Sequence, residues 1–376
     1  MLTLSTAFDS GAIETISLED HANIRLNLRA DNASAFKQWF HFRLSGTAFR
    51  ECVMHIENAG QSAYPGGWDG YAARASYDGI EWFCVPTEYE NGVLTIRHQP
   101  QRDTVYYAYF EPYSWERHLQ MLGHAQISPD CVIRELGQTV DGRPLDMLRI
   151  GTPEPGKKTI WITARQHPGE SMAEWCAEGV IGTLLDTQHA VGRTLLNKAV
   201  FYIVPNMNPD GSVRGNLRTN AAGTNLNRAW QAPSMETSPE VFLVRQAMQE
   251  TGVDAFFDMH GDESIPHNFV AGCEDNPSFS AHQRALQDAF KTLWVAVSPD
   301  FQTEYGYGDS QFGPETLTLA TNWVGDHFGC LAFTLEMPFK DTANHPEPDV
   351  GWNGERSMQL GVSMLTALNG VIDRLR

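Results

Sequence analysis

The pattern of hydrophobic and polar residues divides the chain into two parts. Up to residue 110, apolar and polar positions alternate in short runs such as "KQWFHFRLSGT" and "DTVYYAYFEPY", separated by Gly, Asn and Asp. This alternation is typical of half-buried strands, and the Asn-Gly pair at 91–92 indicates a hairpin. We therefore predict an all-β sandwich domain over residues 1–115. It lacks a cluster of His, Cys or acidic residues, which favours a structural or binding role.

A short amphipathic segment follows the predicted sandwich. In "SWERHLQMLGHA", Trp115, Leu119 and Leu122 recur at the spacing of one helical face. We predict a linker helix over residues 116–127 that joins the two parts of the chain.

From residue 128 onward, continuous apolar runs alternate with helical patterns. Such runs are typical of strands buried on both faces, and their alternation with helices indicates an α/β domain with a mixed sheet over residues 128–376. The predicted strands are 157–163, 198–205, 253–260 and 330–338, and the predicted helices are 171–186, 238–251, 279–294 and 354–375. Two further strands flank an Asp-Gly turn at 141–142.

Charge and composition exclude several classes of function. The chain has 46 acidic and 27 basic residues, a net charge of −19, which argues against a basic face for nucleic acid. It has no apolar run long enough to cross a membrane and no visible secretory signal at its start, so we expect a cytoplasmic protein. The six cysteines are scattered without a C-x-x-C pair, which predicts reduced thiols.

Candidate metal ligands follow three of the predicted strands. His167 and Glu170 come directly after one strand, His260 ends another, and Glu336 lies near the end of a third. Functional groups of an α/β sheet collect at the carboxyl ends of its strands. Each residue alone is better explained as an ordinary polar side chain, but together two His and one Glu form a set that binds catalytic zinc.

A long segment between these strands, residues 204–230, is rich in Asn, Gly and Arg. It is either a surface loop with ordinary turns or a functional segment. Arg214, Arg218 and Arg228 stand out in an acidic protein and suggest the capture of a negatively charged group, because the planar guanidinium matches a carboxylate.

Several motifs, taken together and in order, resemble those of zinc metallocarboxypeptidases. They are "HPGE", "NPDG", "GNLRTN", "GTNLNRAW", "DMHGD" and "TLEMPF". The "HPGE" form and a leading β-domain that ends in "YYAYFEPYSWERHLQML" are similar to the cytosolic carboxypeptidase subfamily. The resemblance covers both parts of the chain.

The resemblance implies roles for the strand-end residues. His167, Glu170 and His260 are expected to bind one Zn²⁺ ion. Glu336 is expected to act as general base on the metal-activated water and then as proton donor to the leaving amine. Asp258 is a candidate for orienting one of the histidine ligands from behind.

The same resemblance implies a site for a peptide C-terminus. Arg218 is expected to polarise the scissile carbonyl, and Asn227 and Arg228 are expected to bind the terminal carboxylate. The substrate would be the C-terminal peptide bond, or a side-chain-linked glutamyl bond, of a peptide or protein. A family tyrosine on a loop upstream of the catalytic glutamate corresponds to Tyr305 or Tyr307, between which the sequence does not choose.

Specificity is less well defined by the sequence. The stretch 318–333 should line the pocket for the last side chain of the substrate. Relatives that remove glutamate carry basic residues here, whereas this chain has only His327 and Asp326. Lys340 is one candidate for a basic residue supplied from elsewhere.

Other functions are compatible with parts of the pattern. A zinc amidohydrolase of the same fold, acting on an N-acyl amino acid or an acylated amine, is the nearest alternative. A non-catalytic relative is disfavoured because all ligands and the base are present. A cysteine hydrolase is disfavoured because Cys176 lies within a predicted helix, away from any histidine motif. The sequence does not specify the oligomeric state.

Overall fold

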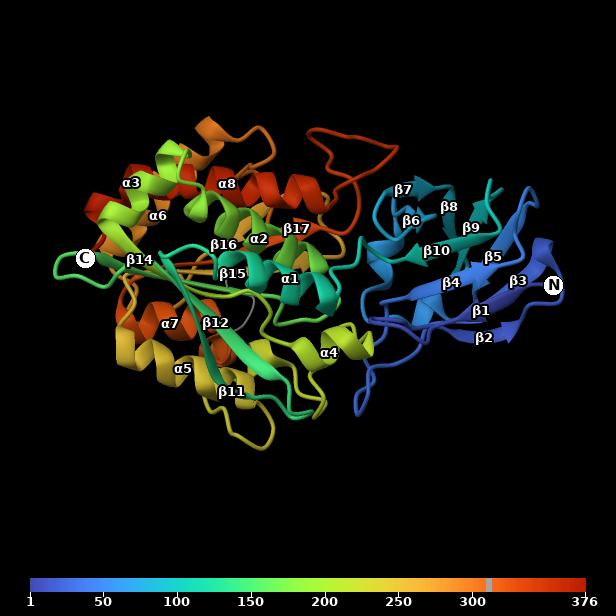
Figure 1. The fold of residues 1–376 in the computed structure, drawn as a ribbon, viewed down its shortest axis with the longest axis horizontal. Coiled ribbons are helices and arrows are strands. Elements are labelled where there is room, and N and C mark those ends of the chain that lie inside the picture. The colour runs from blue at the N-terminus through green and yellow to red at the C-terminus, as the bar shows by residue number, and fades with distance from the viewer. Residues whose placement is uncertain (309–312) are drawn as a thin grey trace.

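The alternating N-terminal runs form two five-stranded sheets at one end of an elongated molecule (Figure 1). The structure, a computed structural model, describes residues 1–308 and 313–376. The first sheet has the order β1 (Thr3–Ser5), β4 (His41–Ser45), β10 (Thr104–Ala108), β6 (Ala73–Ser76) and β7 (Trp82–Val85). The second has the order β2 (Glu14–Ser17), β3 (Ile24–Asn27), β5 (Cys52–Ile56), β9 (Val93–His98) and β8 (Thr87–Glu90). The prediction of an all-β N-terminal domain is confirmed.

Helix α1 (Trp115–Ala125) connects the two parts, and its N-terminus is capped by Ser114, whose hydroxyl accepts the Arg117 N–H at 3.1 Å. Its buried residues are His118, Met121, Leu122 and Ala125. The predicted apolar face was therefore partly wrong, since Leu119 is 48% exposed. The buried face includes a histidine, which an apolar pattern does not count. The domain limits at 115 and 127 stay a prediction.

A seven-stranded mixed sheet forms the centre of the second part. Its order is β11 (Cys131–Gln138), β12 (Pro144–Ile150), β14 (Ala199–Val204), β13 (Lys158–Ala164), β15 (Ala255–Asp262), β17 (Leu331–Pro338) and β16 (Phe269–Ala271). Strands β14, β13, β15 and β17 are parallel, whereas β11, β12 and β16 pair antiparallel with their neighbours. The predicted mixed sheet is confirmed.

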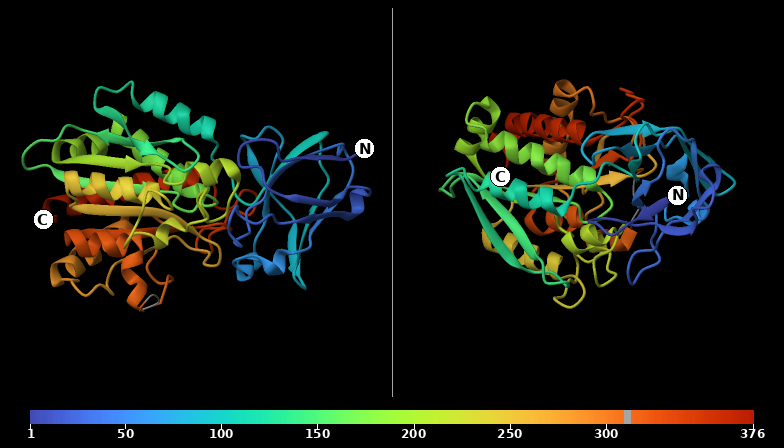
Figure 2. Two further views of the ribbon diagram at one scale, coloured as in Figure 1. Left: turned by 90° about the horizontal axis from the view of Figure 1, so that it is seen from below. Right: turned by 45° about the vertical axis from the view of Figure 1, so that its right-hand side comes forward.

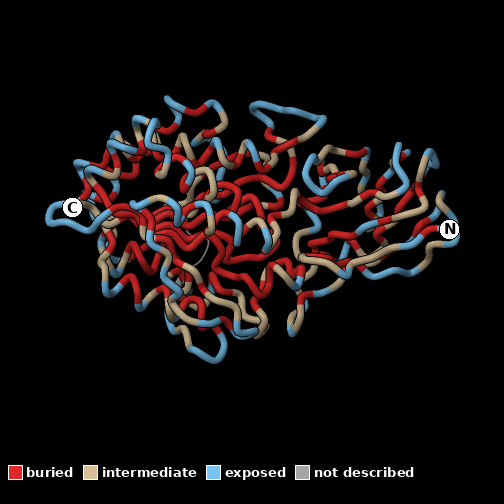
Figure 3. Tube along the Cα trace, in the orientation of Figure 1, coloured by how far each residue is buried: buried red, intermediate tan, exposed pale blue. Residues whose placement is uncertain are grey.

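Helices cover both faces of this sheet, which explains why its central strands are apolar throughout (Figures 1 and 2). In Figure 3 these strands form the largest continuous buried region of the molecule. The helices are α2 (Ser171–Leu185), α3 (Ala190–Lys198), α4 (Pro209–Arg214), α5 (Pro239–Thr251), α6 (Ala281–Val297), α7 (Ala320–Phe328) and α8 (Gly354–Val371).

The structure departs from the predicted elements at several places. Helices α3, α4 and α7 were not predicted, because each is short and does not present a long apolar period. The segment 204–230 is not a surface loop: it contains α4 and a 3-10 turn, and residues 204–212 are all buried. All six cysteines are free thiols. Among the helices of the described residues, none is long and apolar enough to cross a bilayer.

Candidate active site

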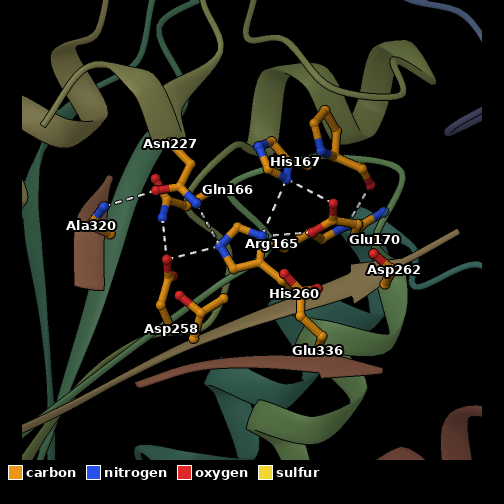
Figure 4. A network of polar contacts seen from close by, with 12 residues as sticks. Arg165, Gln166, His167, Glu170, Asn227, Asp258, His260, Asp262, Ala320 and Glu336 are labelled. Carbon is orange, nitrogen blue, oxygen red and sulfur yellow. Dashed lines mark hydrogen bonds and ion pairs between the residues drawn. The ribbon is translucent and has the colours of Figure 1, made fainter. Parts of the chain in front are cut away.

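The chain leaves β13 through a tight turn that a buried arginine fixes. Arg165 adopts a left-handed conformation, with φ of 59°, and is 1% exposed. Its guanidinium donates from Nε to the Pro168 carbonyl at 2.9 Å and from Nη1 to Glu174 at 2.8 Å. The turn is therefore tied to helix α2, and the two polar residues on it, His167 and Glu170, are held in one orientation (Figure 4).

His167, Glu170 and His260 converge at the carboxyl ends of β13 and β15 (Figure 4). One potential ligand atom from each lies within 4.8 Å of the others, and all three residues are buried. Glu170 Oε1 lies 2.7 Å from His167 Nδ1, and Glu170 Oε2 lies 2.8 Å from His260 Nδ1. The two Nδ1 atoms are 3.2 Å apart.

The opposite nitrogen of each imidazole is bound to an oxygen acceptor. His260 Nε2 lies 2.8 Å from Asp258 Oδ2, and His167 Nε2 lies 3.0 Å from Asn225 Oδ1. His260 lies between two carboxylates, so its Nε2 can donate to Asp258 while its Nδ1 faces Glu170 and the cluster. Gln166 also donates to Asp258, at 2.5 Å. Two nitrogens and a carboxylate aimed at one point fit a zinc ion.

The electrostatics of the cluster favour a cation. Burial, assisted by the charge of Arg218, lowers the pKa of His167 to about 4, which keeps this imidazole neutral as a ligand must be. Burial also opposes charge on His260, but Asp258 and Glu170 outweigh it and raise the pKa of His260 well above its ordinary value. The negative field that holds a proton there would also attract a divalent metal ion.

Glu336 lies beside the cluster because of strand register. It pairs directly with His260 across β15 and β17, and burial raises the pKa of its carboxyl well above the ordinary range, while His260 opposes this. Its Oε1 accepts the Tyr307 hydroxyl at 3.0 Å, and its buried Oε2 has no hydrogen-bond partner among the described residues. Tyr307 also contacts Asp262, at 2.9 Å. Tyr305 is 52% exposed and does not line the site, so of the two tyrosines it is Tyr307 that reaches it.

Two of the three arginines in the segment 204–230 reach the site. Arg218, Asn227 and Arg228 line the same cavity as the cluster. Burial, with the charge of Arg218, lowers the pKa of Arg228. Arg214 instead binds Asp141 through two contacts of 2.8 Å at the outside of the domain. The suggestion that Arg214 captures a negative group is therefore not supported by its position.

The cavity in front of the cluster has a volume of about 910 Å³. It is bounded by residues of both domains, including Tyr64, His167, Glu170, Arg218, Arg228 and Glu336. It therefore brings two members of the cluster, His167 and Glu170, to one space with Glu336 and two arginines.

The stretch predicted to line the pocket for the terminal side chain contributes only in part. Asn322 of this stretch lines the cavity, and so does Thr334 of β17, directly after the stretch. His327 and Asp326 point elsewhere: His327 stacks on Trp323 with ring centroids 4.6 Å apart, and Asp326 accepts a hydrogen bond from Ser278 Oγ at 2.5 Å.

Two basic residues of α6 line the cavity, whereas Lys340 does not. Lys340 donates to the Asp69 carbonyl at 2.5 Å and is not among the cavity-lining residues. Arg284 and Lys291, both on α6, do line it, and Lys291 lies 3.7 Å from Glu274. The pairing and direction of these side chains depend on packing, so the sequence did not single them out.

Several residues around the site were not anticipated. Arg165, Gln166 and Asn225 support the ligands, and Tyr64 brings a residue of the N-terminal domain to the cavity. Gln166 and Asn225 lie next to predicted site residues in the sequence, and this proximity was the only feature that could have identified them. Tyr64 lies far from every motif and carried none.

Comparison with known proteins gives the family. Residues 119–351, more than half of the chain, match the zinc carboxypeptidase family, and residues 4–110 match the cytosolic carboxypeptidase N-terminal domain. The chain belongs to the zinc carboxypeptidase family. It is thus a peptide-bond hydrolase of a class that uses one zinc ion.

Solved structures of other zinc carboxypeptidases share the whole architecture. A metallo-carboxypeptidase from Burkholderia cenocepacia is 53% identical with a TM-score of 0.98, covering 99% of this chain and 100% of that one. A metallo-carboxypeptidase from Pseudomonas aeruginosa, in complex with (2-guanidinoethylmercapto)succinic acid, is 46% identical with a TM-score of 0.96, covering 100% of both chains. Mouse cytosolic carboxypeptidase 6 is 29% identical over 90% of this chain and 67% of its own length. A cytoplasmic location for this carboxypeptidase stays a prediction.

Proposed function

We propose that this carboxypeptidase removes the C-terminal residue of peptides or proteins, with its zinc ion held by His167, Glu170 and His260. The observation that carries the proposal is the shared cavity, in which the ligand cluster, Glu336 and two arginines face one space. When bound, the metal supplies a Lewis acid that polarises the scissile carbonyl and lowers the pKa of a water molecule towards neutrality.

Glu336 is the proposed general base. Its unpartnered Oε2 can accept a proton from the attacking water, whose oxygen adds to the carbonyl carbon. As the C–N bond breaks, the same carboxyl returns the proton to the amine nitrogen. Burial raises the pKa of this carboxyl, so it is a stronger base than an exposed glutamate and suits this exchange.

In this proposal, each of the two arginines binds a different negatively charged group of the substrate. Arg218 is close enough to the cluster to lower the pKa of His167, so we assign it to the carbonyl oxygen as charge develops there. Arg228 and Asn227 are assigned to the terminal carboxylate. Asn227 Oδ1 accepts the Ala320 N–H at 2.8 Å, which fixes the amide and leaves Nδ2 as a donor.

A peptide or protein chain is the proposed substrate, in preference to a small N-acyl amino acid. The cavity of about 910 Å³ exceeds the space that one amino acid needs, and Tyr64 extends its wall onto the N-terminal domain. Its lining includes Asn322, Arg284 and Lys291 together with Glu274 and Asp275, and this polar composition favours a polar terminal side chain. Peptides that differ in length and in their last residue (Glu, Asp, Lys or Phe) test both points. Hydrolysis confined to N-acyl amino acids would support the amidohydrolase instead.

The test of the carboxylate site compares free and amidated C-termini. Arg228→Ala should raise KM for a free C-terminus by about 10- to 100-fold, the factor that corresponds to ~1.5–3 kcal/mol for a charge-assisted hydrogen bond. Arg214→Ala is the matched control, because this arginine binds Asp141 outside the cavity. Equal cleavage of free and amidated peptides by the unmodified enzyme would contradict the proposal.

A further inference from the structure

One acidic residue of the N-terminal domain binds the backbone of the segment that carries Arg218. The Asp31 carboxylate accepts the N–H groups of Leu217, Arg218 and Thr219 at 2.6, 2.8 and 2.9 Å, and the Thr219 hydroxyl at 3.0 Å. Four donors from three successive residues thus converge on one side chain. The contact joins the N-terminal domain to the segment that follows α4.

We propose that Asp31 is a positioning residue for catalysis, and that the N-terminal domain thereby sets the position of Arg218 in the site. The proposal rests on the proposed role of Arg218 at the scissile carbonyl. It assigns to the N-terminal domain a part in the reaction beyond forming a wall of the cavity.

The segment around Arg218 needs such support because it has no regular structure. Residues 215–225 belong to no helix or strand, so their N–H groups lack ladder partners. Asp31 is 5% exposed; burial raises the pKa of its carboxyl, and the bonds from Leu217, Arg218 and Thr219 oppose this. Charge-assisted hydrogen bonds in a buried place are stronger than neutral ones, so the carboxylate fixes this backbone.

The N-terminal domain also holds the side chain of Arg218. The guanidinium carbon lies 5.6 Å from the ring centroid of Phe36 and 5.4 Å from that of Tyr64. Both distances are within the range of a cation–π interaction. One domain therefore restrains the arginine at its backbone through Asp31 and at its charged end through two aromatic rings.

The same contact is connected to the turn that carries the metal ligands. Leu217 donates its N–H to Asp31, and its carbonyl accepts the Gly169 N–H at 2.9 Å. A Cβ on Gly169 would lie 3.0 Å from that carbonyl oxygen, so the two segments approach as closely as a glycine allows. Displacement of the backbone at Leu217 would alter the distance between Arg218 and the metal cluster.

The test is a double-mutant cycle in the full-length chain, with kcat, KM and zinc content measured for Asp31→Asn, Arg218→Ala and the double variant. Arg218→Ala should lower kcat by about 10²- to 10³-fold, as loss of an oxyanion donor does. Asp31→Asn keeps the side-chain shape but turns an amide towards the N–H groups, and should lower kcat about tenfold with little change in KM or zinc content. In the Arg218→Ala background, Asp31→Asn should lower kcat less than about twofold, because the group it positions is gone.

Glu111→Gln is the control for a purely structural effect. Glu111 is a half-buried carboxylate that also accepts a backbone N–H, from Gly354 at 2.7 Å, but it does not contact the Arg218 segment. It should keep kcat within about twofold even if stability falls. Full activity of Asp31→Asn, or an equal loss with and without Arg218, would overturn the positioning role. An unchanged kcat in Arg218→Ala would instead overturn the proposed function of Arg218 itself.

Discussion

The carboxyl ends of β15 and β17, called the sheet edge below, and the segment 204–230 both contribute polar groups to the cavity. The two regions hold these groups in place in different ways. At the sheet edge, His260 and Glu336 are neighbours because β15 and β17 pair residue by residue. In the segment, buried Asn and Asp side chains replace the missing ladder: Asn208 accepts the Gly211 N–H, and Asn220 accepts those of Ala222 and Thr224. A group on a strand is placed by backbone pairing alone, whereas a group on an irregular segment depends on individual side chains, some from another domain.

The largest effect should come from the sheet edge. Glu336→Gln removes the proposed base without changing the shape of the side chain, so kcat should fall about 10³-fold or more. Zinc content should stay at one ion per chain, because Glu336 is not among the clustered ligands. Kinetics and metal analysis of the same preparation check this. Substantial residual activity in this variant would show that Glu336 is not the general base.

A smaller effect is expected behind the ligands. Asp258→Asn weakens the acceptor that orients His260, and should lower zinc affinity by about 10- to 100-fold in a chelator competition. Asp254→Asn is the matched control, since Asp254 binds the Thr159 N–H at 2.7 Å at the opposite end of the sheet. Equal zinc affinities for the two variants would mean that Asp258 does not orient the ligand.

The irregular segment can be tested through its contact with the N-terminal domain. Gly223 has φ of 80°, and a Cβ there would lie 2.4 Å from the Ala33 carbonyl oxygen. Gly223→Ala should lower the free energy of unfolding by about 2 kcal/mol, from both backbone strain and this collision. Gly142→Ala has the same φ of 80° with no atom within 4 Å, so it reports the strain alone. Equal losses in urea unfolding would show that the domain contact tolerates the extra atom.

The last expected effect is a pH dependence at α1, whose His118 contacts Glu174 of α2 at 2.6 Å. Burial disfavours the charged form of His118, but Asp146 and Glu174 outweigh it and raise its pKa to about 9. Because the folded pKa is above the ordinary 6.5, the stabilisation is complete below about pH 6.5 and is lost as the pH rises through 9. The free energy of unfolding should therefore fall by up to about 3 kcal/mol over this range, and less in His118→Gln. Parallel pH profiles for the two proteins would assign the titration to another group.

The amino-acid sequence predicts the parts of this molecule that depend on local pattern. The strands that lead to His167, His260 and Glu336 are long apolar runs. The mixed sheet and the all-β domain both follow from the periodicity of apolar residues. Helix α4 and the burial of the segment 204–212 could not be predicted this way, because polar side chains bonded to backbone look the same in sequence as exposed ones. The choice of Tyr307 over Tyr305, and the roles of Asn225 and Gln166, depend on directions that only tertiary packing sets.

The bonds between Asp31 and residues 217–219 limit how this chain can be divided. If the carboxypeptidase domain were produced alone, three backbone N–H groups beside the site would lose their acceptor, and Arg218 would lose both aromatic rings that flank it. A chimera that exchanges N-terminal domains between relatives would need to preserve the geometry of the turn at 29–36 and of Tyr64. The two domains are therefore best treated as one catalytic unit, because the interface between them runs through the active site.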